Sequence, residues 1–96
     1  MRVRVRYFTT LRELAGKAEE EVIMGEGATL AELVGMIASK YGEEARNYLY
    51  QKREKGKVDP SIHFLINGEN SRIRSGLDTR LRHADVVAII PPIGGG

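Results

Sequence analysis

Apolar and charged residues alternate at the start of the chain and predict an amphipathic strand. In residues 2–7, RVRVRY, the side chains of Val3, Val5 and Tyr7 fall on one face and three arginines fall on the other, because successive side chains of a strand point to opposite faces. Residues 18–24, AEEEVIM, predict a second strand. We expect the two strands to pair antiparallel, with glutamates of the second opposite arginines of the first.

A short helical turn is predicted between these strands. Thr10 and Glu13 have the spacing of a capping box, Leu11 and Leu14 lie one turn apart, and Gly16 is a typical stop signal.

The strongest periodicity predicts a helix of about 12 residues that follows Thr29. Thr29 and Glu32 again have capping-box spacing, Gly42 is predicted to end the helix in the left-handed conformation, and Gly35 weakens its interior slightly. The apolar positions recur at i, i+3, i+4 and i+7 and form a stripe that would pack on a sheet: Leu30, Leu33, Val34, Ile37, Ala38 and Tyr41.

The second half of the chain predicts a short helix, a hairpin and a final strand. Ala45 and Leu49 indicate the helix, and Asn67–Gly68 is typical of a tight hairpin turn. The basic run at 52–57 is open to two interpretations, a contact with a phosphate or acidic partner and a solvated loop, of which the loop is commoner. The apolar run 86–90, VVAII, is typical of a strand buried on both faces, and two prolines end its pairing.

This element order favours an α+β roll, in which a mixed sheet curls over the main helix with the first and last strands side by side in its centre. We predict one domain over residues 1–90 and a flexible tail over residues 91–96. The length of 96 residues suits a single small domain.

Composition narrows the classes of partner and location. The net charge is +2, and the basic residues are scattered without an aromatic-interleaved RNA-binding motif, so we expect no nucleic-acid partner. No apolar stretch reaches the roughly 18 residues of a membrane span, and the N-terminus lacks the pattern of a secretory signal. We therefore expect a cytoplasmic protein without a membrane partner. The absence of cysteine, which excludes a thiolate nucleophile, agrees with that.

The chain offers no catalytic centre of its own by pattern. His63 and His83 lack a second ligand at helical spacing, so we interpret them as structural and expect no metal. The run Glu19–Glu21 alternates between the faces of a strand, which makes poor acid–base pairs, and a solvated face explains it better. No nucleophile elbow or phosphate-binding glycine loop is present.

The remaining candidate for chemistry is the C-terminal tail, PPIGGG, with its free carboxylate. Pro91 and Pro92 stiffen its exit by fixing φ, and residues 91–96 can extend roughly 20 Å at about 3.3 Å per residue. Glycines let a backbone pass through a narrow channel. A carboxylate resists nucleophiles until its oxygen becomes a good leaving group, which adenylation by a partner would supply. The chain would then be a carried substrate.

Residues 85–96, DVVAIIPPIGGG, are similar to the end of the molybdopterin-synthase small subunits, which are ubiquitin-like sulfur carriers. YFTTLRELAG, ATLAELV and INGE also sit where that family has counterparts, so the resemblance covers nearly the whole chain. It implies a ubiquitin-like β-grasp fold. It also implies that an enzyme of the ubiquitin-activating type uses ATP to adenylate the C-terminal glycine. A sulfur donor then provides a thiocarboxylate, and the large synthase subunit receives the tail while sulfur passes to a pterin precursor of the molybdenum or tungsten cofactor.

The same resemblance implies roles for individual residues. Gly96 would carry the activated carboxylate, Gly95 would permit threading, and Phe8 with the last strand would contribute to a docking face. The inserted tail would consist of Pro91, Pro92, Ile93 and Gly94, and the chain would bind no cofactor itself.

Two features depart from the family pattern and leave alternatives open. Gly94 stands where the family more often has Ala or Ser, and residues 43–60 are longer than in compact members, which leaves the choice of partner open. The thiamine sulfur carriers share the terminal Gly-Gly but are typically shorter, which disfavours them. The alternatives are a carrier that gives sulfur to transfer RNA, a modifier joined to protein lysines, and an interaction domain with an inert glycine end.

Overall fold

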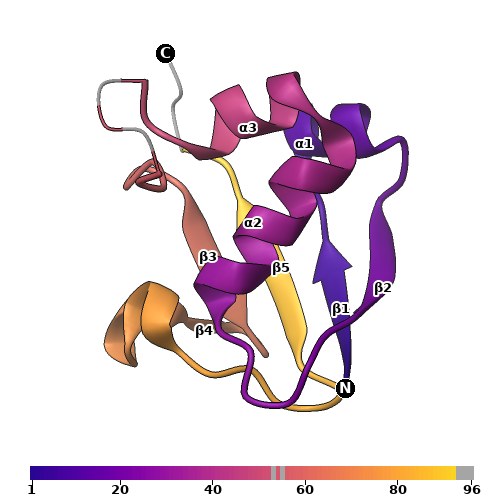
Figure 1. The fold of residues 1–96 in the computed structure, drawn as a ribbon, viewed down its shortest axis with the longest axis vertical. Helices are drawn as coiled ribbons and strands as arrows, with labels where there is room; N and C mark the ends of the chain where they lie inside the picture. The colour runs from indigo at the N-terminus through magenta and orange to yellow at the C-terminus, as the bar shows by residue number, and fades with distance from the viewer. Residues whose placement is uncertain (53, 55, 93–96) are drawn as a thin grey trace.

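The computed structural model describes residues 1–52, 54 and 56–92, and a mixed five-stranded sheet organises them (Figure 1). The strand order is β2-β1-β5-β3-β4, so the first and last strands lie side by side in the centre as predicted. β1 and β5 run parallel and the other neighbours pair antiparallel. The strands are β1 (Arg2–Arg6), β2 (Glu19–Ile23), β3 (His63–Ile66), β4 (Glu69–Asn70) and β5 (Val86–Ile90). The predicted α+β roll is confirmed.

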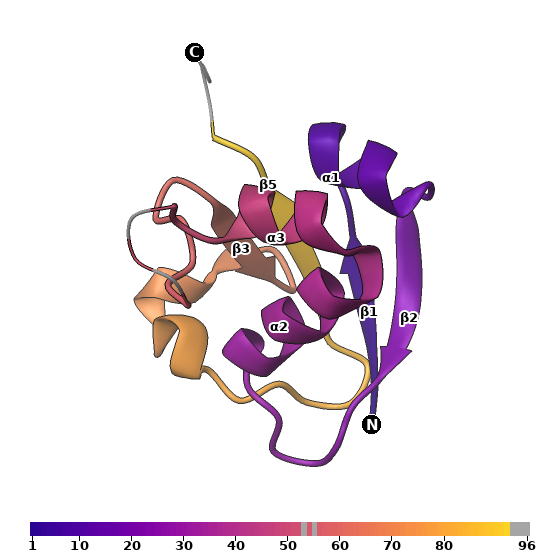
Figure 2. The same cartoon turned by 45° about the horizontal axis from the view of Figure 1, so that its top comes forward.

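Three α-helices accompany the sheet, and α2 runs obliquely across one of its faces (Figures 1 and 2). They are α1 (Thr9–Ala15), α2 (Leu30–Tyr41) and α3 (Glu43–Leu49). Two short 3₁₀ helices, Ser71–Ile73 and Gly76–Asp78, follow β4 and were not predicted from the sequence pattern. None of the helices in the described residues has the length and apolar character needed to cross a bilayer.

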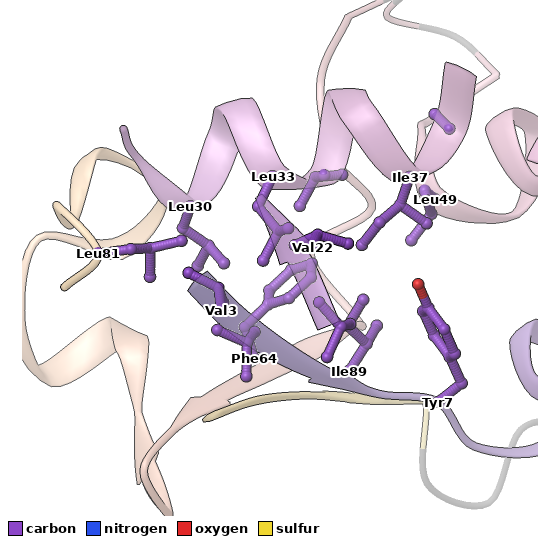
Figure 3. Close-up of a cluster of buried hydrophobic side chains, with 14 of the residues drawn as sticks. Val3, Tyr7, Val22, Leu30, Leu33, Ile37, Leu49, Phe64, Leu81 and Ile89 are labelled. Atoms are coloured by element: carbon purple, nitrogen blue, oxygen red, sulfur yellow. The ribbon is translucent and has the colours of Figure 1, made fainter. Parts of the chain in front are cut away.

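The core lies between α2 and the sheet, where the apolar stripe of the helix meets the inward-facing side chains of the strands (Figure 3). Leu30, Leu33 and Ile37 on α2 are at most 1% exposed. They pack in one cluster with residues of four strands, namely Val3, Val22, Phe64 and Ile89. The helical period of the stripe therefore indicated the buried face correctly, although Tyr41 at its end is only half-buried.

The predicted pairing of arginines with glutamates is confirmed on the opposite face of the sheet. Arg4 pairs with Glu21 across β1 and β2, and Arg6 pairs with Glu19. The Arg4 guanidinium donates to Glu19 and Glu21, each at 2.9 Å. These side chains are about half exposed, so each ion pair is worth only about 0–1 kcal/mol.

A buried aspartate ties the hairpin to the start of β5. Asp85 accepts hydrogen bonds from the side-chain amide of Asn67 at 2.9 Å and from the backbone N–H of Arg82 at 2.8 Å. The Asn67 side-chain oxygen Oδ1 accepts a hydrogen bond from the backbone N–H of Val86 at 2.9 Å. Asn67 and Gly68 have φ values of 52° and 84°, which agrees with the predicted tight turn.

Three local predictions were wrong. Thr10 and Glu13 form no capping box, because α1 begins two residues earlier: its N-cap is Phe8 and not Thr10, without a side-chain cap, and Thr9 turns the chain with φ 45°. Gly42 has φ 86° and ψ −162°, an extended and not a left-handed helical value of ψ, because it ends α2 and begins α3 at once.

The third concerns β5, which is fully buried on one face only. Val87 and Ile89 are 0% and 1% exposed, whereas Val86, Ala88 and Ile90 are half-buried. The described helices cover only the face that carries Val87 and Ile89, which explains the difference.

Replacing Thr29 by alanine is expected to destabilise the protein by about 1 kcal/mol, because Thr29 and Glu32 form the predicted capping box of α2. The matched control is Thr10→Ala, which removes no cap and should change the free energy of unfolding by less than about 0.5 kcal/mol. Urea unfolding of both variants measures the difference. Equal losses in the two variants would contradict the observed helix starts.

Candidate functional site at the end of strand β5

Strand β5 is paired on both sides up to Ala88 and on the β3 side up to its last residue, Ile90, and then leads into the proline pair. Arg6 of β1 pairs with Ala88, and His63 of β3 pairs with Ile90. Pro91 and Pro92 follow and are half-buried, and because proline has no N–H and a fixed φ, they end the ladder and set the direction of the exit. We call Ile90, Pro91 and Pro92 the tail root. It lies at the opposite end of β5 from the N-terminus of the chain (Figure 1).

The predicted working residues of the tail, Ile93, Gly94, Gly95 and Gly96, lie outside the described residues. Their roles as inserted tail and as bearer of the activated carboxylate therefore stay predictions. The described part of the site is its anchor, a central strand that ends in two prolines.

Phe8 lies at the same end of the sheet as the tail root. β1 and β5 are parallel with Arg6 opposite Ala88, and Phe8 follows Arg6 by two residues as Ile90 follows Ala88. The Phe8 side chain is half-buried, and the Arg6 guanidinium lies 6.0 Å from the centre of its ring. Sequence reasoning thus placed Phe8 near the root, while its role in docking stays a prediction.

Half-buried apolar side chains extend from the root along the face of the sheet that lacks α2. Val86, Ala88 and Ile90 point to this face from β5, and Leu65 lies directly opposite Ala88 on β3. The ion pairs of Arg4 with Glu19 and Glu21 border this apolar strip on the β1 side. A partner that receives the tail would meet apolar surface flanked by charge, a common composition for an interface.

Sequence reasoning missed a polar cluster around the Glu20 carboxylate on the other face of the sheet. Glu20 lies opposite Val5, and its side chain is only 8% exposed, so the prediction of a solvated face is wrong for this residue. It accepts a hydrogen bond from Tyr7 at 2.5 Å, another from Tyr41, and an ion-paired contact from Lys40 at 2.5 Å. The cluster joins β1, β2 and the end of α2. The signal was present, because alternation places residue 20 on the face of Val22.

The partners of Glu20 decide its protonation. Burial alone would raise the pKa of the Glu20 carboxyl, but the hydrogen bonds from Lys40, Tyr41 and Tyr7 outweigh burial and lower its pKa to about 2. Burial, followed by the hydrogen bond to Glu20, raises the pKa of Tyr7. Glu20 is therefore ionised and Tyr7 neutral near neutral pH. This is a stabilising arrangement with no group poised for proton transfer.

Replacing Glu20 by glutamine is expected to destabilise the protein by about 1–3 kcal/mol near neutral pH, because Lys40 and the two tyrosines lose a charged acceptor. The folded-state pKa lies below the ordinary value of 4.5, so the stabilisation is complete above about pH 4.5 and is lost as the pH falls through about 2. Denaturant unfolding at about pH 7 and about pH 2 should show the difference shrinking.

Glu21→Gln is the matched control, since the Glu21 side chain is 49% exposed and contacts Arg4 on the other face. It should cost less than about 0.5 kcal/mol at both pH values. An equal, pH-independent loss in the two variants would contradict the role assigned to Glu20.

The two histidines have structural contacts, as the pattern suggested. His83 accepts a hydrogen bond from the backbone of Arg2 at 3.0 Å, and His63 lies 3.2 Å from the side-chain amide of Asn70. Within the part of the chain that the structure describes, no three of the potential metal-ligating side chains of His, Asp and Glu come together.

Comparison with protein families gives a match to the ThiS family over residues 5–96. Three curated proteins are similar in sequence. Small archaeal modifier protein 3 of Haloferax volcanii is 28% identical over 96 residues, covering 100% of both chains. A putative sulfur carrier protein of Archaeoglobus fulgidus is 34% identical over 74 residues, covering 77% of this chain and 81% of its own. The molybdopterin synthase sulfur carrier subunit of Chlamydomonas reinhardtii is 30% identical over 96 residues, covering 100% of both.

Solved structures agree in fold. The small archaeal modifier protein 1 of Methanosarcina acetivorans superposes with a TM-score of 0.82 at 34% identity, covering 99% of this chain and 96% of that one. A chain of the BexX/CysO complex of Amycolatopsis orientalis superposes with a TM-score of 0.71 at 28% identity, covering 98% and 99%. The β-grasp fold expected from the sequence is confirmed.

Proposed function

This chain belongs to the ThiS family of ubiquitin-like sulfur carriers and modifiers, and from that premise we propose that it carries sulfur as a thiocarboxylate on Gly96 and gives it to a pterin precursor in molybdopterin synthesis. The observation that carries the proposal is the continuity of the match: the family model extends over residues 5–96 and so includes the whole tail. A relative named as a molybdopterin synthase sulfur carrier subunit matches this chain from end to end at 30% identity.

The geometry of the tail root supports this use of the tail. β5 is paired on both sides up to Ala88 and with β3 up to Ile90, so a partner that binds the sheet face gains a defined starting point for the tail. Pro91 and Pro92 reduce the number of directions in which the remaining residues can leave. A stiff root lowers the entropy lost when the tail enters a channel.

The proposed chemistry needs two steps before sulfur is delivered. An oxygen of the Gly96 carboxylate attacks the α-phosphorus of ATP bound by a partner, and pyrophosphate leaves. A sulfide-level donor then attacks the acyl carbon, the bond from that carbon to the AMP oxygen breaks, and the terminal group becomes a thiocarboxylate. Neither step oxidises or reduces any atom, so no oxidant or reductant is needed. The chain supplies only the acyl group, which agrees with a domain that offers no catalytic centre by pattern.

Delivery to the acceptor regenerates the carrier. The thiocarboxylate sulfur attacks an electrophilic carbon of the pterin precursor and displaces an oxygen substituent, which leaves with its bonding electrons, so that a thioester forms. Water then attacks the acyl carbon, and the bond from that carbon to sulfur breaks with its electron pair going to sulfur. The sulfur stays on the acceptor, and Gly96 recovers its carboxylate. Three partners follow from this sequence: an adenylating enzyme, a sulfur donor and a large synthase subunit that binds the tail and the pterin. The similarity to a chain of the BexX/CysO complex of Amycolatopsis orientalis is in line with such partners.

Reconstitution tests the pterin acceptor. Thiocarboxylated protein, the large synthase subunit from the same organism and the pterin precursor are mixed, and formation of the dithiolene product is measured with loss of the thiocarboxylate. We expect two thiocarboxylates to be lost for each dithiolene that forms, because a dithiolene contains two sulfur atoms and each carrier delivers one. Loss of the thiocarboxylate without dithiolene, or no turnover with a large subunit shown to be folded, would contradict molybdopterin synthesis as the destination of the sulfur.

A protein-modifier function is the second candidate, favoured by similarity to two proteins named as small archaeal modifiers. It uses the same acyl-adenylate but transfers the acyl group to a lysine amine instead of to sulfur. Trypsin cleaves after Lys and Arg, so tryptic digests of host-cell protein would then contain lysines that carry residues 83–96, HADVVAIIPPIGGG. Their absence under conditions in which the thiocarboxylate accumulates would count against this function.

A further inference from the structure

A pocket on the helical side of the molecule is separate from the tail root. It has a volume of about 720 Å³ and is lined by residues of α2, α3 and the segment that follows α3. A β-bridge between Tyr50 and Val58, with a 2.8 Å hydrogen bond from the Gln51 N–H to the Lys57 carbonyl, holds one wall in place. Nothing in the sulfur-carrier chemistry uses this pocket.

Gly35 forms part of the wall contributed by α2, and its glycine identity has no explanation in the described packing. Glycine inside a helix is less stable than alanine. A Cβ at residue 35 would meet only the Tyr50 hydroxyl, at an ordinary contact distance of 3.7 Å. Neither crowding nor a positive φ therefore requires glycine here. Its effect is to leave the α2 backbone uncovered at the pocket, where another chain can approach closely.

The described lining is cationic and rich in hydrogen-bonding groups. Arg46 and Lys52 contribute the charges, and neither has a carboxylate within 4.0 Å among the described residues. Ser39, Asn47 and Gln51 add side-chain donors, and no Asp or Glu belongs to this described lining. A guanidinium and an ammonium that line the same pocket favour an anionic ligand such as a carboxylate.

We propose that this pocket binds an extended acidic segment of a partner protein, with the segment's backbone against Gly35 and its carboxylates at Arg46 and Lys52. The volume supports a peptide over a single phosphate ion, since sites of roughly 300–1,000 Å³ hold ligands of several residues or of drug size. The proposal also assigns a purpose to the start of the basic run at 52–57. It does not depend on the tail, so it can fail or succeed independently of the sulfur-carrier function.

The test uses two fluorescein-labelled probes, a short peptide of alternating glutamate and glycine and the same peptide with glutamine in place of glutamate. We expect the acidic probe to bind, to shift the backbone amide NMR signals of Gly35, Asn47 and Tyr50, and to weaken with added salt. The glutamine probe should bind at least about 10-fold more weakly. Inorganic phosphate and pyrophosphate are titrated in parallel.

Variants locate the site. Arg46→Gln and Lys52→Gln should each weaken the acidic probe by about 3- to 10-fold, and Gly35→Leu should block it by filling the pocket. Arg80→Gln is the matched control, because Arg80 is exposed and does not line the pocket. Circular dichroism melts confirm that each variant is folded before binding is compared.

Three results would overturn the proposal. The acidic probe fails to bind at millimolar concentration, or Arg80→Gln weakens it as much as Arg46→Gln does, which would mean non-specific attraction to a basic surface. The third is binding of pyrophosphate at this pocket with no binding of the acidic peptide, which would make it a small-anion site.

Discussion

Removal of Gly96 is expected to abolish adenylation of the chain while leaving its fold intact. The truncated tail still ends in a glycine carboxylate, but that carboxylate is retracted by about 3.3–3.6 Å. Misplacement of a reacting group by 1 Å can cost about 100-fold in rate, so we expect a loss of at least that size. ATP–pyrophosphate exchange catalysed by the cognate activating enzyme measures it. All described strands precede the tail, so the unfolding midpoint should not change.

Gly94→Ala is the matched control for the truncation, because it alters the tail without changing its length. Members of the resembled family more often have Ala or Ser at this position, so we expect exchange within a few-fold of the wild-type rate. If the truncated chain exchanged pyrophosphate as fast as wild type, Gly96 would not be the activated residue. If Gly94→Ala lowered the exchange rate as much as the truncation, the rate would depend on the composition of the tail, and the argument from tail length would fail.

Replacing Ile89 by alanine is expected to cost about 3–4 kcal/mol of stability, the largest structural effect of any prediction made here. Ile89 is 1% exposed, lies opposite Phe64 in the central sheet and packs in the core under α2. The alanine side chain would leave a cavity between strand and helix that close packing cannot fill without strain. Guanidinium unfolding measures the loss, which is a large share of the total stability of a small domain.

The neighbouring Ile90→Ala provides the control, since Ile90 points to the opposite face of β5 and is half-buried. We expect a cost of less than about 1.5 kcal/mol. Similar losses at both positions would support the sequence-based expectation of a strand buried on both faces and would contradict the observed arrangement.

Periodicity predicted the fold because one side of each main element is buried. The stripe from Leu30 to Ala38 had no competing pattern, and the alternation of Val3 and Val5 with arginines set the face of β1. Asn67–Gly68 identified the hairpin because its turn requires positive φ values. The central pairing of β1 with β5 was predicted as one compact solution for this element order, and it is observed.

Other features depend on tertiary contacts that a local pattern does not contain. The apolar run 86–90 predicted a strand buried on both faces. The observed burial of β5 depends on which face of the sheet the helices cover. In the sequence, Glu20 is one of three consecutive glutamates. It differs from the other two in its register opposite Val5 and in its hydrogen bonds from Tyr7 and Tyr41, which the structure shows. Thr9, with φ 45°, starts α1 before the residue that the capping-box spacing favoured.

The sequence predicted the anchor of the tail but not the pocket beside Gly35. The anchor, a central strand ending in Pro91 and Pro92 beside Phe8, is present where the pattern and the resemblance placed it. The pocket beside Gly35 was not foreseen, because residues 35, 46 and 52 come together only through the packing of α3 on α2. The relatives include proteins named as sulfur carriers and one named as a modifier. The acceptor of the sulfur or of the acyl group must therefore be identified by a biochemical experiment.

The most direct test of the central claim is the intact mass of the protein isolated from its own cells under conditions that preserve thioacids, compared with the Gly96 deletion. We predict a wild-type mass increase equal to sulfur replacing one oxygen, and no increase in the deletion. An unmodified wild-type mass, with the protein found instead attached to larger proteins, would contradict the sulfur-carrier function and favour the modifier function.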